Sequence, residues 1–213
     1  EIKKANDLLA KGVKPEALYE TLTKDGKGPA AIEKKDVAIS PTAPWKGNKN
    51  AKVVIQEFSD FQCPYCKRVE DTVAEVMKNY GDKVKFYWRN FPLDFHQDAP
   101  LAAEAAVEAY KQKGNDGFWK MHDRMYAAQG TPEGIKRDNL EKIAQDIGLD
   151  MPKFKAALDQ TSHKAEIDAD TAAGKAAGVS GTPAFFINGY FLSGAQPYPK
   201  FRKLIEKALS EAK

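Results

Sequence analysis

The chain has 213 residues, of which 42% are hydrophobic, enough for one sizeable core or for a domain with an insertion. Its 33 basic and 30 acidic residues give a formal charge of +3, which is too balanced to suggest a nucleic-acid-binding protein. No apolar run approaches the roughly 18 residues of a membrane-spanning helix, so we expect none. The chain begins at Glu1, which we interpret as a sign of trimming or of signal-peptide removal.

Residues 1–35 are predicted to form a separate helical arm. Apolar residues favour two short helices, over 6–10 and 15–22, and the Gly- and Pro-containing run 25–29 breaks any helix that reaches it. Two interpretations of the arm stay open, a packed or frayed segment and a dimerisation element.

Residues 36–96 are predicted to form the first part of an α/β domain. Residues 37–39 favour a short strand, and residues 52–59 have the Val- and Ile-rich pattern of a buried parallel strand. A helix is predicted over 63–79, because valines recur on one of its faces. Residues 84–89 alternate between apolar and polar side chains, which predicts another strand.

Residues 97–178 are predicted to form an inserted, all-helical subdomain. Their apolar periodicity and capping residues favour helices over 98–110, from Asp116 onward, and over 138–147, 152–158 and 162–177. A connection of about 80 residues between two strands would be implausible as a loop, so these helices form a subdomain of their own.

Residues 179–213 are predicted to return to the sheet. Apolar runs at 184–187 and 190–193 flank Asn188-Gly189, which is a strong hairpin signal. An amphipathic helix over 197–212 ends the chain. The whole order predicts an α/β fold in which a βαβ half precedes a ββα half, with one mixed sheet and helices on both faces.

Cys63 and Cys66 are the only cysteines, and they stand at the predicted start of the first long helix. A helix N-terminus has unpaired N–H groups and a partial positive charge, both of which stabilise a thiolate. Pro64 suits the first helical position, where its missing N–H costs nothing. We therefore predict a redox pair, with Cys63 as the more exposed nucleophile and Cys66 as the buried resolving thiol.

Two other interpretations of the cysteine pair were weighed, a metal site and an inert structural disulfide. A structural zinc site needs four ligands, and the chain has no second cysteine pair. The three histidines are scattered: His96 is expected to be structural, His122 to lie in the core, and His163 to lie at the surface. We expect no metal, nucleotide or flavin.

Two motifs together resemble the DsbA-like branch of the thioredoxin superfamily. They are FSDFQCPYC at 58–66 and GTPAFFING at 181–189, and the resemblance covers about residues 36–212. Members of this branch are bacterial periplasmic thiol:disulfide oxidoreductases, with a helical insertion in a thioredoxin fold. The resemblance therefore implies the same fold and activity here.

The resemblance also implies a substrate-binding site around the cysteines, made by Pro64, Tyr65, Thr182 and Pro183. It implies that Pro183 is cis and faces the cysteine pair, so that nearby backbone groups can pair with an extended peptide. The alternative is an ordinary trans proline at a strand start. Tyr65, Pro183 and Phe61 are a candidate apolar collar for unfolded chains.

Glu57 precedes Cys63 by six residues, in a strand that is expected to be buried. A buried charge is costly unless it is paired or protonated, so a buried Glu57 should have a raised pKa. It resembles the family's buried acid, a candidate proton acceptor for Cys66. The alternative is a surface glutamate on an edge strand. Lys85 and Arg89 are candidate counter-charges, and Asp60 is expected to order its loop.

The resemblance implies an oxidase at the periplasmic or extracytoplasmic face of a bacterial envelope. Its substrates would be cysteines of unfolded or partly folded exported proteins, its partner a membrane redox protein, and its only redox group the Cys63–Cys66 disulfide. Tyr65 stands where the strongest oxidants of the family have His, which leaves a DsbC- or DsbG-like reductase or isomerase open, with a homodimer formed through the arm. A redox-inert binding or chaperone-like module and glutathione-dependent chemistry also stay open.

Overall fold

The structure is a computed structural model that describes residues 7–12, 14 and 34–212. The chain divides into two compact units, Glu1–Ile32 and Glu33–Lys213. In the first unit, residues 7–10 form one helical turn, within the first predicted helix. The second predicted helix, over 15–22, and the proposed dimerisation role of the arm lie outside the described residues.

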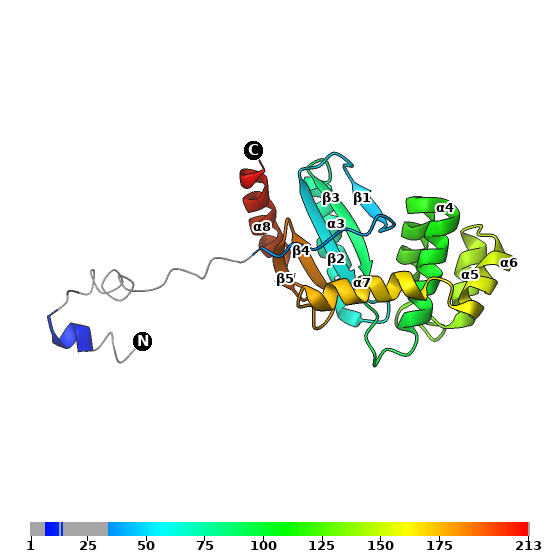
Figure 1. The fold of residues 1–213 in the computed structure, drawn as a ribbon. Coiled ribbons are helices and arrows are strands. Elements are labelled where there is room, and N and C mark those ends of the chain that lie inside the picture. Colours follow the sequence, from blue (N-terminus) through cyan, green and yellow to red (C-terminus); the bar gives the residue numbers. More distant parts are fainter. Residues whose placement is uncertain (1–6, 13, 15–33, 213) are drawn as a thin grey trace. The chain divides into compact units, whose positions relative to one another are not determined.

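The second unit is built on a five-stranded mixed sheet with the order β1-β3-β2-β4-β5 (Figure 1). Its strands are Trp45–Gly47 (β1), Val53–Ser59 (β2), Val84–Asn90 (β3), Ala184–Ile187 (β4) and Tyr190–Ser193 (β5). The central strands β2 and β3 are parallel, and all other neighbours are antiparallel. The predicted mixed sheet, with a βαβ half followed by a ββα half, is therefore confirmed.

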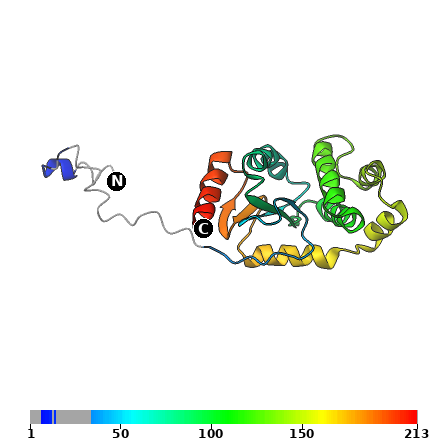
Figure 2. The same cartoon turned by 90° about the horizontal axis from the view of Figure 1, so that it is seen from above.

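Helices cover both faces of this sheet and form a separate block beside it. They are Pro64–Tyr80 (α3), Ala99–Ala128 (α4), Arg137–Asp146 (α5), Met151–Gln160 (α6), Lys164–Ala176 (α7) and Tyr198–Glu211 (α8). Figure 2 shows α3 and α8 on one face of the sheet and α7 along the other, with α4, α5 and α6 to one side. The predicted α/β class with an all-helical insertion is confirmed, since α4 to α7 lie between β3 and β4 in the chain.

Helix α4 joins two segments that the sequence predicted as separate helices. It runs through Gly114, whose φ of 61° and ψ of −150° are not helical and fall in a region that favours glycine. The two halves therefore meet at a kink, which explains why the sequence pattern was interrupted there.

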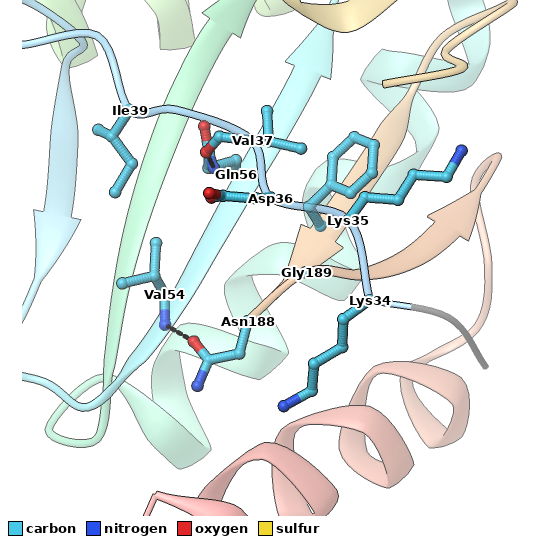
Figure 3. A pocket seen from close by; sticks show the side chains of 10 residues that line it. Lys34, Lys35, Asp36, Val37, Ile39, Val54, Gln56, Asn188 and Gly189 are labelled. Carbon is cyan, nitrogen blue, oxygen red and sulfur yellow. Dashed lines mark hydrogen bonds between the residues drawn. The ribbon is translucent and has the colours of Figure 1, made fainter. Parts of the chain in front are cut away.

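The predicted strand at 37–39 is wrong. Residues 34–39 instead cross the sheet as an extended segment without strand pairing, apart from one bridge between Lys34 and Tyr190 (Figure 3). Side chains satisfy its backbone in place of a neighbouring strand, because Gln56 Nε2 donates to the Val37 carbonyl at 2.7 Å. The first strand is β1 instead, which at three residues is too short to show a pattern.

A buried ion pair ties α7 to the sheet. Arg89 Nε donates to Asp170 Oδ1 at 2.6 Å, and Asp170 Oδ2 accepts from the Asn90 N–H at 3.0 Å. The guanidinium also donates to Gln56 Oε1 at 2.7 Å. Each partner is almost fully buried, so the ion pair connects α7 to β3 in the interior of the protein.

Removal of one member of this pair should destabilise the fold strongly. We expect Asp170→Ala to lower the free energy of unfolding by about 3–5 kcal/mol, because it leaves the Arg89 charge buried and unpaired. Asp168→Ala, on the exposed side of α7, is the matched control and should cost less than about 1 kcal/mol. Urea unfolding curves measure the stability of both variants and of the parent. Equal midpoints for Asp170→Ala and the parent would show that the ion pair contributes no stability.

Candidate active site

Cys63 lies between the end of β2 and the start of α3. It is the N-cap residue of α3, with extended backbone angles, and its carbonyl accepts the first helical hydrogen bonds from Cys66 N and Lys67 N. Pro64 occupies the first helical turn, as predicted, and is exposed. The strand therefore delivers Cys63 to the helix N-terminus, where backbone N–H groups favour a thiolate.

Asp60 fixes the loop that carries the cysteines. Its carboxylate accepts hydrogen bonds from Gln62 N at 2.7 Å, from Leu93 N at 2.8 Å and from His96 Nδ1 at 2.8 Å. These bonds join the loop after β2 to the loop after β3. They confirm the loop-ordering role predicted for Asp60 and the structural role predicted for His96.

The Thr182–Pro183 peptide bond is cis, the geometry that the resemblance implies. The Cys63 sulfur lies 3.4 Å from the Thr182 carbonyl oxygen. Residues about 120 positions apart thus meet beside the thiol, because the strand pairing of β2 with β4 brings their loops to one edge of the sheet. Thr182 and Pro183 therefore lie beside the Cys63 thiol, and their role in binding substrate stays a prediction.

The two thiols differ more in electrostatics than in exposure. Both are free and buried, with 3% exposure for Cys63 and 0% for Cys66, so the expected exposure of Cys63 is slight. The hydrogen bond with the Cys66 thiol, helped by Thr182 and by backbone N–H groups, lowers the pKa of Cys63 to about 5. Burial raises the pKa of Cys66 well above its usual range. Cys63 is therefore the thiolate, which supports its assignment as the nucleophile.

Glu57 is fully buried, and neither of its carboxylate oxygens has a hydrogen-bond partner among the described residues. Burial, followed by repulsion from the Glu70 carboxylate, raises the pKa of Glu57 well above its usual range. After burial and the Cys63 thiol, a charge on Glu57 also raises the pKa of Cys66. The surface interpretation of Glu57 is wrong, and its role as a proton acceptor stays a prediction.

The two proposed counter-charges for Glu57 are wrong. Glu57 pairs in register with Trp88 and Phe185, and Arg89, one residue on, faces the opposite side of the sheet, where it binds Asp170. Lys85 instead lies over the Trp45 ring, with 4.5 Å from its Nζ to the ring centroid. Among the residues that the structure describes, no cation forms an ion pair with the Glu57 carboxyl, and Lys46 acts on it only through its charge.

The sequence assigned no role to Ser59, Glu70 and Tyr126, and placed His122 only in the core. Tyr126 bonds to Ser59 at 3.2 Å, and His122 Nε2 lies 3.8 Å from Glu70 Oε1. His122 is buried, which confirms its predicted core placement. A sequence signal for these contacts was available, because residues four apart lie on the same face of a helix. Cys66 and Glu70 have this spacing, and so do His122 and Tyr126.

The collar prediction is wrong for two of its three members. Phe61 is 1% exposed and stacks on Trp88 at 4.6 Å, where it fills the space between the sheet and α4, and Pro183 is also buried. Tyr65 is 54% exposed, and the loop after β3 presents a second aromatic ring, Phe95, which is 75% exposed. Among the described residues, the exposed aromatic rings are therefore Tyr65, beside Cys66 in the chain, and Phe95.

His163 is not a free surface residue, contrary to the prediction. Its Nε2 lies 2.7 Å from Glu108 Oε2, and its backbone N–H donates to Glu104 at 2.9 Å. The contact ties the start of α7 to α4. Among the described residues, no group of three His, Cys, Asp or Glu side chains is placed to hold a metal, and no helix has the length and apolarity to cross a membrane.

The pocket of about 390 Å³ beneath residues 34–39 lies away from the cysteines (Figure 3). Val54 and Asn188 line it, joined by a hydrogen bond of 2.7 Å from the Val54 N–H to Asn188 Oδ1. Val54 is near the start of β2, whereas Cys63 follows the end of that strand. The pocket therefore takes no part in cysteine chemistry.

A thiolate-forming cysteine at a helix N-terminus, a buried partner thiol and a cis-proline define a thiol-disulfide oxidoreductase of thioredoxin fold. The thioredoxin family profile matches residues 39–207, and the chain belongs to this family. It is a redox enzyme of the DsbA-like class. Oxidised BdbD from Bacillus subtilis has a similar structure, with a TM-score of 0.73 and 25% identity, over 86% of this chain and 100% of BdbD.

Two further proteins are similar over part of their length or in fold alone. A periplasmic thioredoxin-like protein from Salmonella enterica serovar Typhimurium shares the fold, with a TM-score of 0.65 and 20% identity over 82% of this chain and 94% of that one. The Na(+)/H(+) antiporter NhaA 3 of Salinispora tropica is 38% identical over 145 residues, which are 68% of this chain and 21% of the antiporter. The chain thus spans about a fifth of the length of that relative.

Proposed function

We propose that the chain is a disulfide-forming oxidase that acts on cysteines of unfolded or partly folded exported proteins. One observation carries the proposal, the position of Cys63 at the N-terminus of α3, where its pKa is lowered to about 5. A thiolate of low pKa is a good leaving group and stabilises the reduced enzyme, which raises the reduction potential of the pair.

The reaction is an exchange of two electrons between two pairs of sulfur atoms. A substrate thiolate attacks Cys63 Sγ of the oxidised pair, the Cys63–Cys66 bond breaks, and Cys66 leaves with the electron pair and takes a proton. The second substrate thiolate then attacks the substrate sulfur of the mixed disulfide and releases Cys63 as a thiolate. The substrate has gained a disulfide, and the enzyme has gained two electrons.

Reoxidation requires a partner that accepts these two electrons, for which we propose a membrane redox protein. We place the enzyme in the periplasm, or at the extracytoplasmic face of a bacterial envelope. Disulfides form and persist in such oxidising compartments, which supports this location. The disulfide itself is the redox group, and the reaction balances without any other cofactor.

The reduction potential of the Cys63–Cys66 pair tests the direction of the reaction. We expect a value near about −120 mV in glutathione buffers, measured by thiol trapping and mass spectrometry. A value near about −270 mV would instead indicate a reductase or isomerase. Failure of the pair to equilibrate with glutathione would indicate a redox-inert module and would overturn the proposal.

Exposed aromatic rings beside the cysteines should bind apolar segments of unfolded substrates. We expect the double variant Tyr65→Ser/Phe95→Ser to lose about tenfold in rate with a cysteine-containing peptide, because each ring buries apolar area on binding. The rate with glutathione should stay unchanged, since glutathione does not reach both rings. Ile39→Ser is the matched control, an exposed apolar residue (39%) near the far pocket. Equal peptide rates for the parent and the double variant would contradict the role of the rings.

A further inference from the structure

Three elements each contribute two polar side chains to one cluster, in which Ser59 bonds to Tyr126 and His122 lies beside Glu70. Strand β2 contributes Glu57 and Ser59, α3 contributes Cys66 and Glu70, and α4 contributes His122 and Tyr126. Both Glu57 oxygens, Glu70 Oε1 and His122 Nε2 are buried there without a hydrogen-bond partner among the described residues. Such atoms cost stability and are rare in folded proteins, so a cluster of four has to be accounted for.

Glu70 is the member of this cluster with the most exposure to solvent. Its Oε1 is buried, yet 24% of its side chain is exposed. It lines a pocket of about 480 Å³ between α3 and the end of α4, together with Lys67, Tyr126 and Gln129. Glu57, in contrast, has no exposed surface from which it could exchange a proton with water.

We propose that Glu70 carries protons between the buried Glu57–Cys66 pair and the solvent in this pocket, and that His122 positions its carboxylate. The proposal deepens the proposed function and rests on it, because it supplies the proton that Cys66 takes when it leaves. Glu70 touches neither substrate nor a reacting sulfur, so it is a positioning and relay residue.

His122 is held in one orientation by its surroundings. Its Nδ1 donates to Asp123 Oδ1 at 2.8 Å, and this bond is the main cause that lowers the pKa of Asp123 and keeps it anionic. The rings of Trp88, Trp119 and Tyr126 enclose the imidazole, with centroids 4.9–5.0 Å away. With Nδ1 engaged, Nε2 is the imidazole nitrogen nearest Glu70, 3.8 Å from its Oε1.

The charges around both carboxyls fit a proton relay. Glu70 is faced by His122 and Asp123 from α4, by Lys46 from β1 and by Asp71 on its own helix, and Glu57 is faced by Glu70 and Lys46. Burial is the main cause that raises the pKa of each carboxyl. Each therefore keeps a proton at a higher pH than an exposed glutamate does, as a proton donor must.

The proton follows the electron pair in the first step of the exchange. When substrate attacks Cys63, Cys66 leaves as a thiolate and takes the proton of Glu57. Glu70 then returns a proton to Glu57, and solvent in the pocket returns one to Glu70. Reoxidation runs the same transfers in reverse, so no proton is created or lost.

The test is the rate of the Cys66 step in Glu70→Gln, measured by stopped flow with a peptide dithiol at low buffer concentration. We expect the rate to fall by about tenfold, within the range of general acid–base effects. Formate or acetate that enters the pocket should restore the rate, because a small carboxylic acid can transfer protons in place of the missing Glu70 carboxyl. Glu75→Gln, an exposed change of the same type on α3, should match the parent.

A second variant separates the relay from a structural effect. His122→Phe keeps an aromatic ring in the cluster but removes Nε2, whose charge lowers the pKa of Glu70. The pH profile of the rate should therefore move to higher pH. A Glu70→Gln rate equal to that of the parent, or a slow rate that formate and acetate do not restore, overturns the relay. Failure of the parent to oxidise the peptide at all would overturn the proposed function, and the relay with it.

Discussion

Cys63→Ser should abolish thiol–disulfide exchange, with a loss of about a thousandfold or more, because the variant has no nucleophilic sulfur at the helix N-terminus. Cys66→Ser should still form a mixed disulfide with a substrate but should fail to release it, so the adduct should accumulate. Mass spectrometry after acid quenching distinguishes the two outcomes. A Cys63→Ser variant that keeps the parent's rate would exclude the proposed chemistry.

The pH dependence of the parent adds a second check on the same thiol. A Cys63 pKa of about 5 means that the thiolate predominates above that pH and is lost as the pH falls through it. Alkylation of Cys63 by iodoacetamide should therefore be nearly constant between about pH 6 and 8, where an ordinary cysteine with a pKa near 8.5 still gains reactivity. A rate that rises tenfold per pH unit over this range would show that the thiol is not activated.

The elements that the sequence predicted correctly are those with a strong local signal. The Val-rich face of α3, the Asn188-Gly189 turn and the cysteines at a helix start all lie within short windows. Each of them fixed a part of the fold near the site, because apolar periodicity and turn chemistry act between close neighbours in the chain. The βαβ–ββα order followed from their sequence.

What the sequence missed depends on contacts between distant segments. Arg89 was proposed as a partner of Glu57, but the register of β2 on β3 decides which side chains share a face, and no local pattern encodes that register. Glu70 and His122 are 52 positions apart, and only the packing of α4 against α3 brings them together.

Hydrophobicity also fails to distinguish a ring that fills the core from a ring that binds a partner. Phe61 and Phe95 are both aromatic and lie in loops on either side of β3, yet the first is 1% exposed and the second 75%. The bonds of Asp60 to Leu93 and His96 hold the second loop in place. These long-range hydrogen bonds could not be predicted from either loop alone.

Glu57→Gln should stabilise the fold, by an amount that grows with pH. In the unfolded chain, a glutamate has a pKa of about 4.3, and below that pH both states hold the proton. Burial raises the pKa of Glu57 well above this value in the folded state, so at higher pH only the unfolded state ionises. The parent then loses about 1.4 kcal/mol of stability per pH unit, until the folded-state pKa is reached. Glutamine does not ionise, and the variant avoids the loss.

Urea unfolding of the reduced proteins across about pH 4 to 8 measures this difference, with Glu75→Gln as the exposed control. The gap between Glu57→Gln and the parent should widen as the pH rises, while the gap for the control stays constant. The same variant should slow disulfide exchange and shift its pH profile, because Cys66 then has no adjacent proton acceptor. Stability curves that run parallel would show that Glu57 ionises equally in both states, and an unchanged profile would show that the proton of Cys66 takes another route. If Glu57→Gln is more stable but exchanges disulfides more slowly, the Glu57 carboxyl destabilises the fold and at the same time accelerates disulfide exchange.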